Sequence, residues 1–88
     1  MATISIIGYE QDGHCDHCGR ALKHCIRLDN GSVVGATCFD KTLTKPRIYR
    51  GKPYRVGSEN IIRYAKIAES GKLARYGVTI NQLTFEAA

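Results

Sequence analysis

The chain has 88 residues, a length that predicts one domain and excludes most folds of multi-substrate enzymes. No apolar run approaches the length of a membrane span, about 20 residues, and the N-terminus lacks the basic region of a signal peptide. We therefore expect a cytoplasmic protein with reduced cysteines and no membrane partner. A domain of this size buries only about 60% of its unfolded surface, so a bound metal ion is a common source of added stability.

The net charge is +5, with thirteen Lys and Arg residues against eight Asp and Glu, and it is unevenly distributed. Residues 1–44 hold four basic and five acidic side chains, whereas residues 45–88 hold nine basic and three acidic ones. The second half therefore predicts an acidic partner, either nucleic acid or an acidic protein surface. No small-molecule substrate is expected.

The first elements in the chain are two strands on either side of a cysteine-rich turn. Residues 3–9 are rich in β-branched side chains and predict a strand, and residues 14–20 predict a knuckle. Residues 21–28 alternate in the manner of a half-buried strand. One face of that strand carries Leu22, His24, Ile26 and Leu28, and the other carries Lys23, Cys25 and Arg27.

A hairpin is predicted next. Asn30 and Gly31 lie between two β-type runs, and this dipeptide favours a two-residue turn in which both residues have positive φ. Residues 32–37 are then the returning strand, and Cys38 ends it. Residues 39–43 predict a single helical turn.

The second half predicts an irregular segment followed by one helix. Two prolines and a glycine favour an extended, irregular structure over residues 44–56. Ser58 is a good N-cap for a helix over residues 59–70, and Gly71 ends that helix. Its predicted buried face holds Ile61, Ile62, Tyr64, Ala65 and Ala68.

The C-terminal residues are ambiguous. Residues 72–76 predict a further turn, and the Val and Thr content of residues 78–85 favours a final strand. A short helix capped by Thr79 is the alternative. Residues 61–83 also resemble a helix-turn-helix weakly, but Gly77 and the β-branched residues after it disfavour a second helix.

The four cysteines carry the strongest chemical signal. Cys15, Cys18, Cys25 and Cys38 form the pattern C-x2-C-x6-C-x12-C. A C-x-x-C knuckle brings two thiolates to one ion, and a hairpin brings Cys38 back beside them. Zn²⁺ prefers four nitrogen or sulfur ligands in a tetrahedron. We therefore expect a closed, structural zinc site that contains Cys15, Cys18 and Cys38.

The fourth ligand is either His24 or Cys25. Cys25 offers a thiolate, and His24 lies on the face of the strand predicted to meet the core, so the residues favour His24 slightly. His14 and His17 are further candidates in or beside the knuckle. Two alternatives to zinc are buried, metal-free cysteines and a redox-active C-x-x-C pair, although the βαβ context of the latter is missing.

Part of this region resembles a known group of proteins. Residues 15–20 (CDHCGR), 22–24 (LKH), 29–31 (DNG) and 34–38 (VGATC) are similar to segments of small zinc-binding proteins of phages and other mobile elements. The resemblance covers residues 13–43 and implies a treble-clef-like zinc finger, with a knuckle, a hairpin and a short helix starting at Val-Gly-x-x-Cys. No second Cys or His follows Cys38 by two or three positions, as a full treble clef requires. A phage protein would act in the host cytoplasm.

The segment over residues 45–55 is the strongest candidate for partner binding. It contains five cations and two tyrosines but no acid, a composition that suits phosphate contacts and base stacking. A solvated loop and a site for an acidic protein are the alternatives. The candidate partner-binding residues are Lys45, Arg47, Tyr49, Arg50, Lys52, Tyr54, Arg55 and Arg63.

Taken together, the residues predict a small, zinc-stapled α+β domain with one main C-terminal helix. It divides into residues 1–44 with the knuckle and hairpin, the basic segment 45–57, and residues 58–88. No nucleophile and base are paired by spacing, so an enzyme is not expected. We expect a non-catalytic zinc module that contacts nucleic acid. The alternative is a small phage-type inhibitor or adaptor that binds a host protein.

Overall fold

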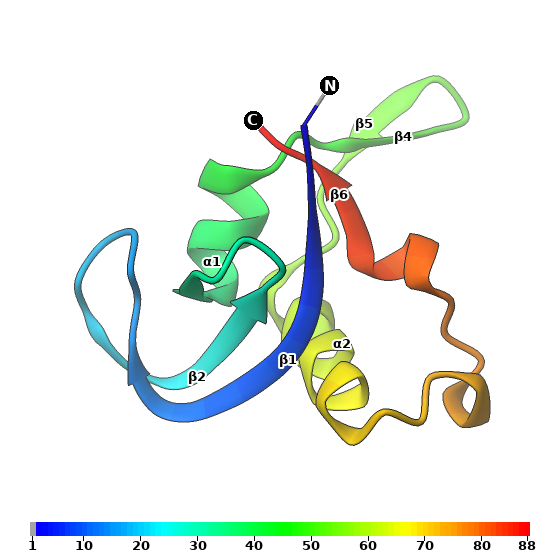
Figure 1. Cartoon of the computed structure of the whole chain (residues 1–88). Helices are drawn as coiled ribbons and strands as arrows, with labels where there is room; N and C mark the ends of the chain where they lie inside the picture. The colour runs from blue at the N-terminus through cyan, green and yellow to red at the C-terminus, as the bar shows by residue number, and fades with distance from the viewer. Residues whose placement is uncertain (1) are drawn as a thin grey trace.

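A four-stranded antiparallel sheet with the strand order β3-β2-β1-β6 organises the protein, and helix α2 packs against its longest strand (Figure 1). The structure is a computed structural model and describes residues 2–88. The strands of the sheet are β1 (Thr3–His14), β2 (Ala21–Leu28), β3 (Val33–Gly35) and β6 (Thr84–Glu86). The two ends of the chain lie close together, because β1 pairs with β6 from Thr3↔Glu86 onward. The small α+β architecture expected from the sequence is therefore confirmed.

Strand β1 is longer than expected, and a bulge bends it. The prediction of a strand over residues 3–9 is confirmed, but pairing with β2 continues to His14, which therefore belongs to the strand and not to the knuckle. The register shifts between Ile6 and Gly8. Beyond the shift, the Tyr9 N–H donates a hydrogen bond to Glu69 Oε2 at 3.2 Å, so the end of α2 is tied to the bulge.

The β2–β3 hairpin matches the sequence in its first strand and differs in its turn. Within this turn, Gly31 has a positive φ of 89° and Asn30 does not. The Asn30 carboxamide oxygen accepts a hydrogen bond from the Ser32 N–H at 2.9 Å and closes a wider turn. The expected two-residue turn with two positive φ values is therefore wrong. The returning strand is also shorter, since β3 ends at Gly35.

Cys38 lies in a helix and not at the end of a strand. Helix α1 (Ala36–Cys38) starts directly after β3 and continues into the π-helical turn η1 (Phe39–Leu43). The helical turn expected over residues 39–43 is confirmed. The prediction that the strand runs to residue 37 is wrong, because the chain turns away from the sheet where the side chain of Phe39 enters the core.

Residues 47–54 form a regular hairpin, which corrects the prediction that all of residues 44–56 are irregular. They form a separate antiparallel ribbon of β4 (Arg47–Tyr49) and β5 (Lys52–Tyr54). Arg50 and Gly51 connect the strands and have φ values of 53° and 77°. This two-residue turn with two positive φ values has the twist that a tight hairpin needs.

Helix α2 (Ser58–Ser70) confirms the predicted main helix. Gly57 occupies the N-cap position and Ser58 is the first helical residue, so the predicted N-cap is wrong by one position. Gly71 ends the helix as expected, with a left-handed φ of 70°. Ile61 and Ala65 are fully buried, and the rest of the predicted face is partly buried against the core.

The C-terminal region follows the alternative prediction more closely than the favoured one. It contains the 3₁₀ turns η2 (Ala74–Tyr76) and η3 (Ile80–Leu83), followed by the short strand β6. The Thr79 N–H donates to Gln82 Oε1 at 2.8 Å at the start of η3. A strand over all of residues 78–85 is therefore wrong. Within residues 72–88 the helical turns have only three and four residues, too few for the recognition helix of a helix-turn-helix.

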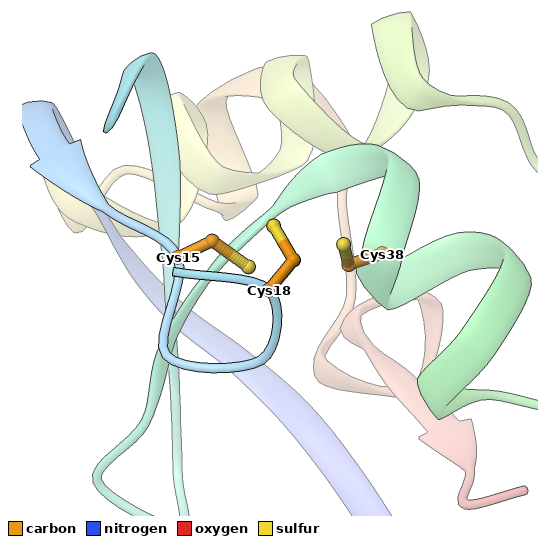
Figure 2. A group of neighbouring side chains, drawn as sticks. All are labelled: Cys15, Cys18 and Cys38. Carbon is orange, nitrogen blue, oxygen red and sulfur yellow. The ribbon is translucent and has the colours of Figure 1, made fainter. Parts of the chain in front are cut away.

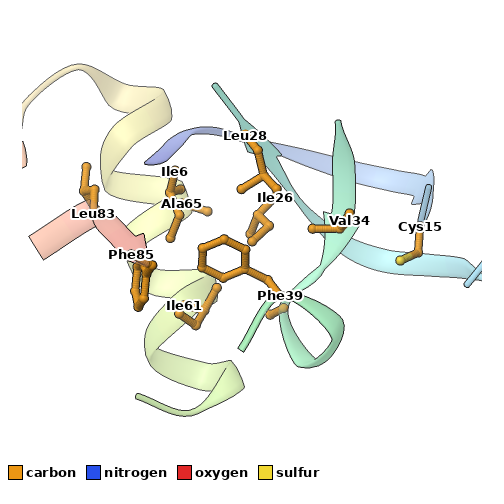
Figure 3. Close-up of a cluster of buried hydrophobic side chains, with 11 residues drawn as sticks. Ile6, Cys15, Ile26, Leu28, Val34, Phe39, Ile61, Ala65, Leu83 and Phe85 are labelled. Atoms are coloured by element: carbon orange, nitrogen blue, oxygen red, sulfur yellow. The ribbon is translucent and has the colours of Figure 1, made fainter. Parts of the chain in front are cut away.

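Phe39 lies at the centre of the hydrophobic core (Figure 3). Its side chain is fully buried and meets Phe85 edge-on, with ring centroids 4.9 Å apart and an interplanar angle of 81°. The surrounding buried side chains are Ile6, Ile26, Leu28, Val34, Ile61, Ala65 and Leu83, with Cys15 at the edge of the cluster. Because Phe39 follows Cys38 directly, packing of the core holds α1 and its cysteine in place.

Candidate metal centre

The knuckle is a closed turn held by its own backbone. The Cys15 N–H donates to the Arg20 carbonyl at 2.9 Å, and the Gly19 N–H donates to the Cys15 carbonyl at 2.7 Å. Gly19 has a φ of 75°, a conformation that a glycine adopts without steric cost. The turn places the side chains of Cys15 and Cys18 on the same side of the loop (Figure 2).

Asp16 joins the knuckle to the strand that leads to the third cysteine. The Asp16 N–H donates to the Val33 carbonyl, and the Val33 N–H donates to Asp16 Oδ2, both at 2.8 Å. Since β3 runs directly into α1, these bonds set the distance between the knuckle and Cys38. No role was predicted for Asp16, and its position inside the C-x-x-C turn was the only signal in the sequence.

The sulfur atoms of Cys15, Cys18 and Cys38 all lie within 4.8 Å of one another (Figure 2). In a tetrahedral zinc site with Zn–S bonds of about 2.3 Å, neighbouring sulfurs are about 3.8 Å apart. The three thiols are free and not joined in disulfides. Within residues 2–88 they are the one group of three or more such side chains that could hold a metal ion. The structure therefore brings together the three cysteines that were expected to share a metal ion, and the separation of their sulfur atoms suits such an ion.

The surroundings shift the pKa values of Cys15 and Cys38 in opposite directions. Burial raises the pKa of Cys15, but backbone hydrogen bonds from Gly35, Cys18 and His17 stabilise its thiolate and lower the pKa to about 7. Burial, together with the hydrogen bonds and negative charges of Cys18 and Cys15, raises the pKa of Cys38 to about 11. Three thiolates in this space repel one another, and a bound cation removes that repulsion.

The two main candidates for a fourth ligand lie in different environments, and neither belongs to the group of three. Nδ1 of the half-buried His24 shares a hydrogen bond with the Tyr9 hydroxyl. The Cys25 thiol is fully buried, contacts the Leu22 carbonyl at 3.9 Å and lies where a side chain on Gly13 would be. Burial raises the pKa of the Cys25 thiol.

His24 also borders the groove in front of the cysteines. This groove has a volume of about 580 Å³. Cys18, Cys38 and His24 line it together with Leu22, Arg20, Ser58 and Ile62. His17 borders a different hollow beside Leu28, and the exposed His14 pairs with Ala21 at the end of β1. The hydrogen bond between Tyr9 and His24 was not predicted, because nothing in the sequence relates residue 9 to residue 24.

The structure divides the predicted partner-binding residues into two groups. Arg47 donates to the carbonyls of Gln82 at 2.7 Å and Thr84 at 3.2 Å, and Arg55 donates to the carbonyls of Asp40 and Thr44. These two arginines hold the segment to the body of the protein. Arg55 is exposed all the same, and so are the remaining predicted residues, which are Lys45, Tyr49, Arg50, Lys52 and Tyr54 in the segment and Arg63 on α2.

Comparisons with known proteins leave the resemblance to phage zinc proteins a prediction. No family model, no curated protein and no solved structure matches the chain. Across residues 2–88, no helix is long and apolar enough to cross a membrane.

Proposed function

We propose that this protein is a non-catalytic module, folded around a structural Zn²⁺ ion, that contacts nucleic acid through its basic segment. The zinc part of the proposal is supported by the three sulfurs within 4.8 Å of one another. The nucleic-acid part is supported by uncompensated charge. Within residues 2–88 the one ion pair joins Arg27 to Glu10, so the cations of residues 45–55 have no acidic partner.

His24 is the fourth zinc ligand in this proposal. It lines the same groove as Cys18 and Cys38, whereas the buried Cys25 side chain packs against Gly13 and does not line that groove. A histidine ligand usually donates its second ring N–H to a neighbouring oxygen, which fixes the tautomer. The Tyr9 hydroxyl is in place to accept from Nδ1 and leaves Nε2 for the ion.

The zinc site is tested with single substitutions and cobalt as a spectroscopic probe. Cys18→Ser and Cys25→Ser remove the same atom from two positions, and only Cys18→Ser is expected to lose the metal. His24→Ala is expected to weaken zinc binding by more than about 100-fold, because loss of a group that only hydrogen-bonds to a ligand already costs about 10- to 100-fold, and to shift the visible bands of bound Co²⁺. Unchanged bands in His24→Ala, or metal loss in Cys25→Ser, would contradict the ligand assignment.

Nucleic-acid binding is tested on the zinc-loaded protein by fluorescence anisotropy. Labelled single-stranded and duplex oligonucleotides are titrated at about 50 mM and about 200 mM salt, where phosphate contacts predict a steep loss of affinity. The absorbance ratio at 260 and 280 nm of the natively purified protein gives an independent measure of co-purifying nucleic acid. Absence of binding to every probe at the lower salt concentration would refute this function.

A small phage-type inhibitor or adaptor that binds an acidic host protein is the second candidate. The side chain of Ile48 is 68% exposed beside the cations of the ribbon, a combination that also suits a protein surface. Capture from bacterial lysate after nuclease treatment separates the two candidates. A specific protein retained by the wild type and lost with Ile48→Asp favours the inhibitor.

A further inference from the structure

The ribbon β4–β5 projects from the body of the protein as a separate two-stranded finger (Figure 1). Its strands have three residues each, and an isolated hairpin of this size is marginally stable in water. Arg47 and Arg55 anchor its base. The Arg47 guanidinium also lies over the Phe85 ring, with Cζ 4.1 Å from the centroid, so the finger is joined to the hydrophobic core.

One face of the finger carries two exposed aromatic rings. The register Arg47↔Tyr54 and Tyr49↔Lys52 places all four residues on the same side, and Ile48↔Pro53 on the other. Tyr49 is 62% exposed and Tyr54 is 42% exposed. Their centroids are 6.2 Å apart at an interplanar angle of 81°, so the rings meet edge to face and do not cover each other.

Cations surround these rings. The Arg50 guanidinium lies over the Tyr49 ring, with Cζ 5.3 Å from the centroid, and Lys52 pairs directly with Tyr49 across the ribbon. Arg50 and Gly51 form the two-residue turn at the tip of the ribbon, with φ values of 53° and 77°, so Arg50 lies at the exposed end of the finger.

Resting on the proposed function, we propose that the Tyr49–Tyr54 face of the finger binds single-stranded nucleic acid. Unpaired bases stack on the two rings, and Arg50 and Lys52 contact the phosphates between them. Stacking needs an exposed base face, which a duplex provides only at its ends. The cations of the ribbon have no acidic partner among residues 2–88, and their charge suits a phosphodiester backbone. A purely electrostatic contact would not need exposed tyrosines, so the two rings favour contacts with bases as well.

The experiment measures binding of zinc-loaded protein to a labelled oligothymidylate of about 15 nucleotides and to a duplex of equal length. Oligouridylate is the third probe and separates RNA from DNA. Tyr49→Ala and Tyr54→Ala are the test variants. Tyr76→Ala is the matched control, because Tyr76 is 57% exposed on a different part of the surface. Thermal unfolding of each variant shows that the fold is retained.

We expect each ribbon variant to bind the single strand about 5- to 100-fold more weakly and Tyr76→Ala to change affinity less than about twofold. Arg50→Gln and Lys52→Gln are expected to reduce the dependence of log affinity on log salt by about 0.7 each. Equal affinity for the duplex, or ribbon variants that behave like Tyr76→Ala, would overturn the inference and leave the proposed function standing. A wild-type protein that binds no probe refutes both.

Discussion

Replacing Phe39 by alanine is expected to destabilise the fold strongly and to make it depend on zinc. Burial of a phenylalanine is worth about 3–5 kcal/mol in core truncations. The Phe39 ring has no exposed surface and an edge-on contact with Phe85, which adds about 1 kcal/mol in such pairs. We therefore expect a loss of about 4–6 kcal/mol, a large part of the stability of about 4–13 kcal/mol typical of this chain length.

Urea unfolding followed by circular dichroism measures this loss, first with chelator and then with zinc. Zinc at about 100 times its dissociation constant stabilises a folded state by about 2.7 kcal/mol, in the variant as in the wild type. Tyr76→Ala is the control and should change stability by less than about 0.5 kcal/mol. A loss below about 1 kcal/mol for Phe39→Ala in chelator, or no stabilisation by zinc, would refute the reasoning.

Three further outcomes are expected. Without metal, the pKa of Cys15 is lowered from 9.0 to about 7, and the stability that this shift contributes is lost as the pH falls through 7. The pKa of Cys38 is raised to about 11, and the stability that this shift contributes is lost as the pH rises through 11. At about 1.4 kcal/mol per unit, the thiol contribution measured by urea unfolding in chelator should rise towards pH 9 and then fall. Asp16→Ala removes the acceptor of the Val33 N–H bond, and a competition titration against a zinc dye should show about tenfold weaker metal binding. Gly71→Ala places a side chain at a φ of 70° and should lower the unfolding free energy by about 1 kcal/mol in the same urea assay, whereas an unchanged midpoint would contradict the capping role.

The sequence correctly predicted those elements whose structure depends mainly on residues close together in the chain. Strand β2 matches the alternating run of residues 21–28, and α2 ends at the expected Gly71. The grouping of Cys15, Cys18 and Cys38 also followed from spacing, because a C-x-x-C turn and a returning hairpin leave few other arrangements. The ribbon β4–β5 was missed, since prolines favour irregular structure and its two anchoring arginines bond to carbonyls 11 to 37 residues away.

The chain alone therefore established a small α+β domain with a basic second half and a cysteine group that suits a metal ion. Only the tertiary structure decided that Cys38 approaches the knuckle from a helix, because the burial of Phe39 turns the chain away from the sheet. It also showed that Arg47 and Arg55 anchor the basic segment and that Tyr9 bonds to His24. These relations depend on contacts between residues distant in the sequence, and no local pattern encodes which partner a side chain meets.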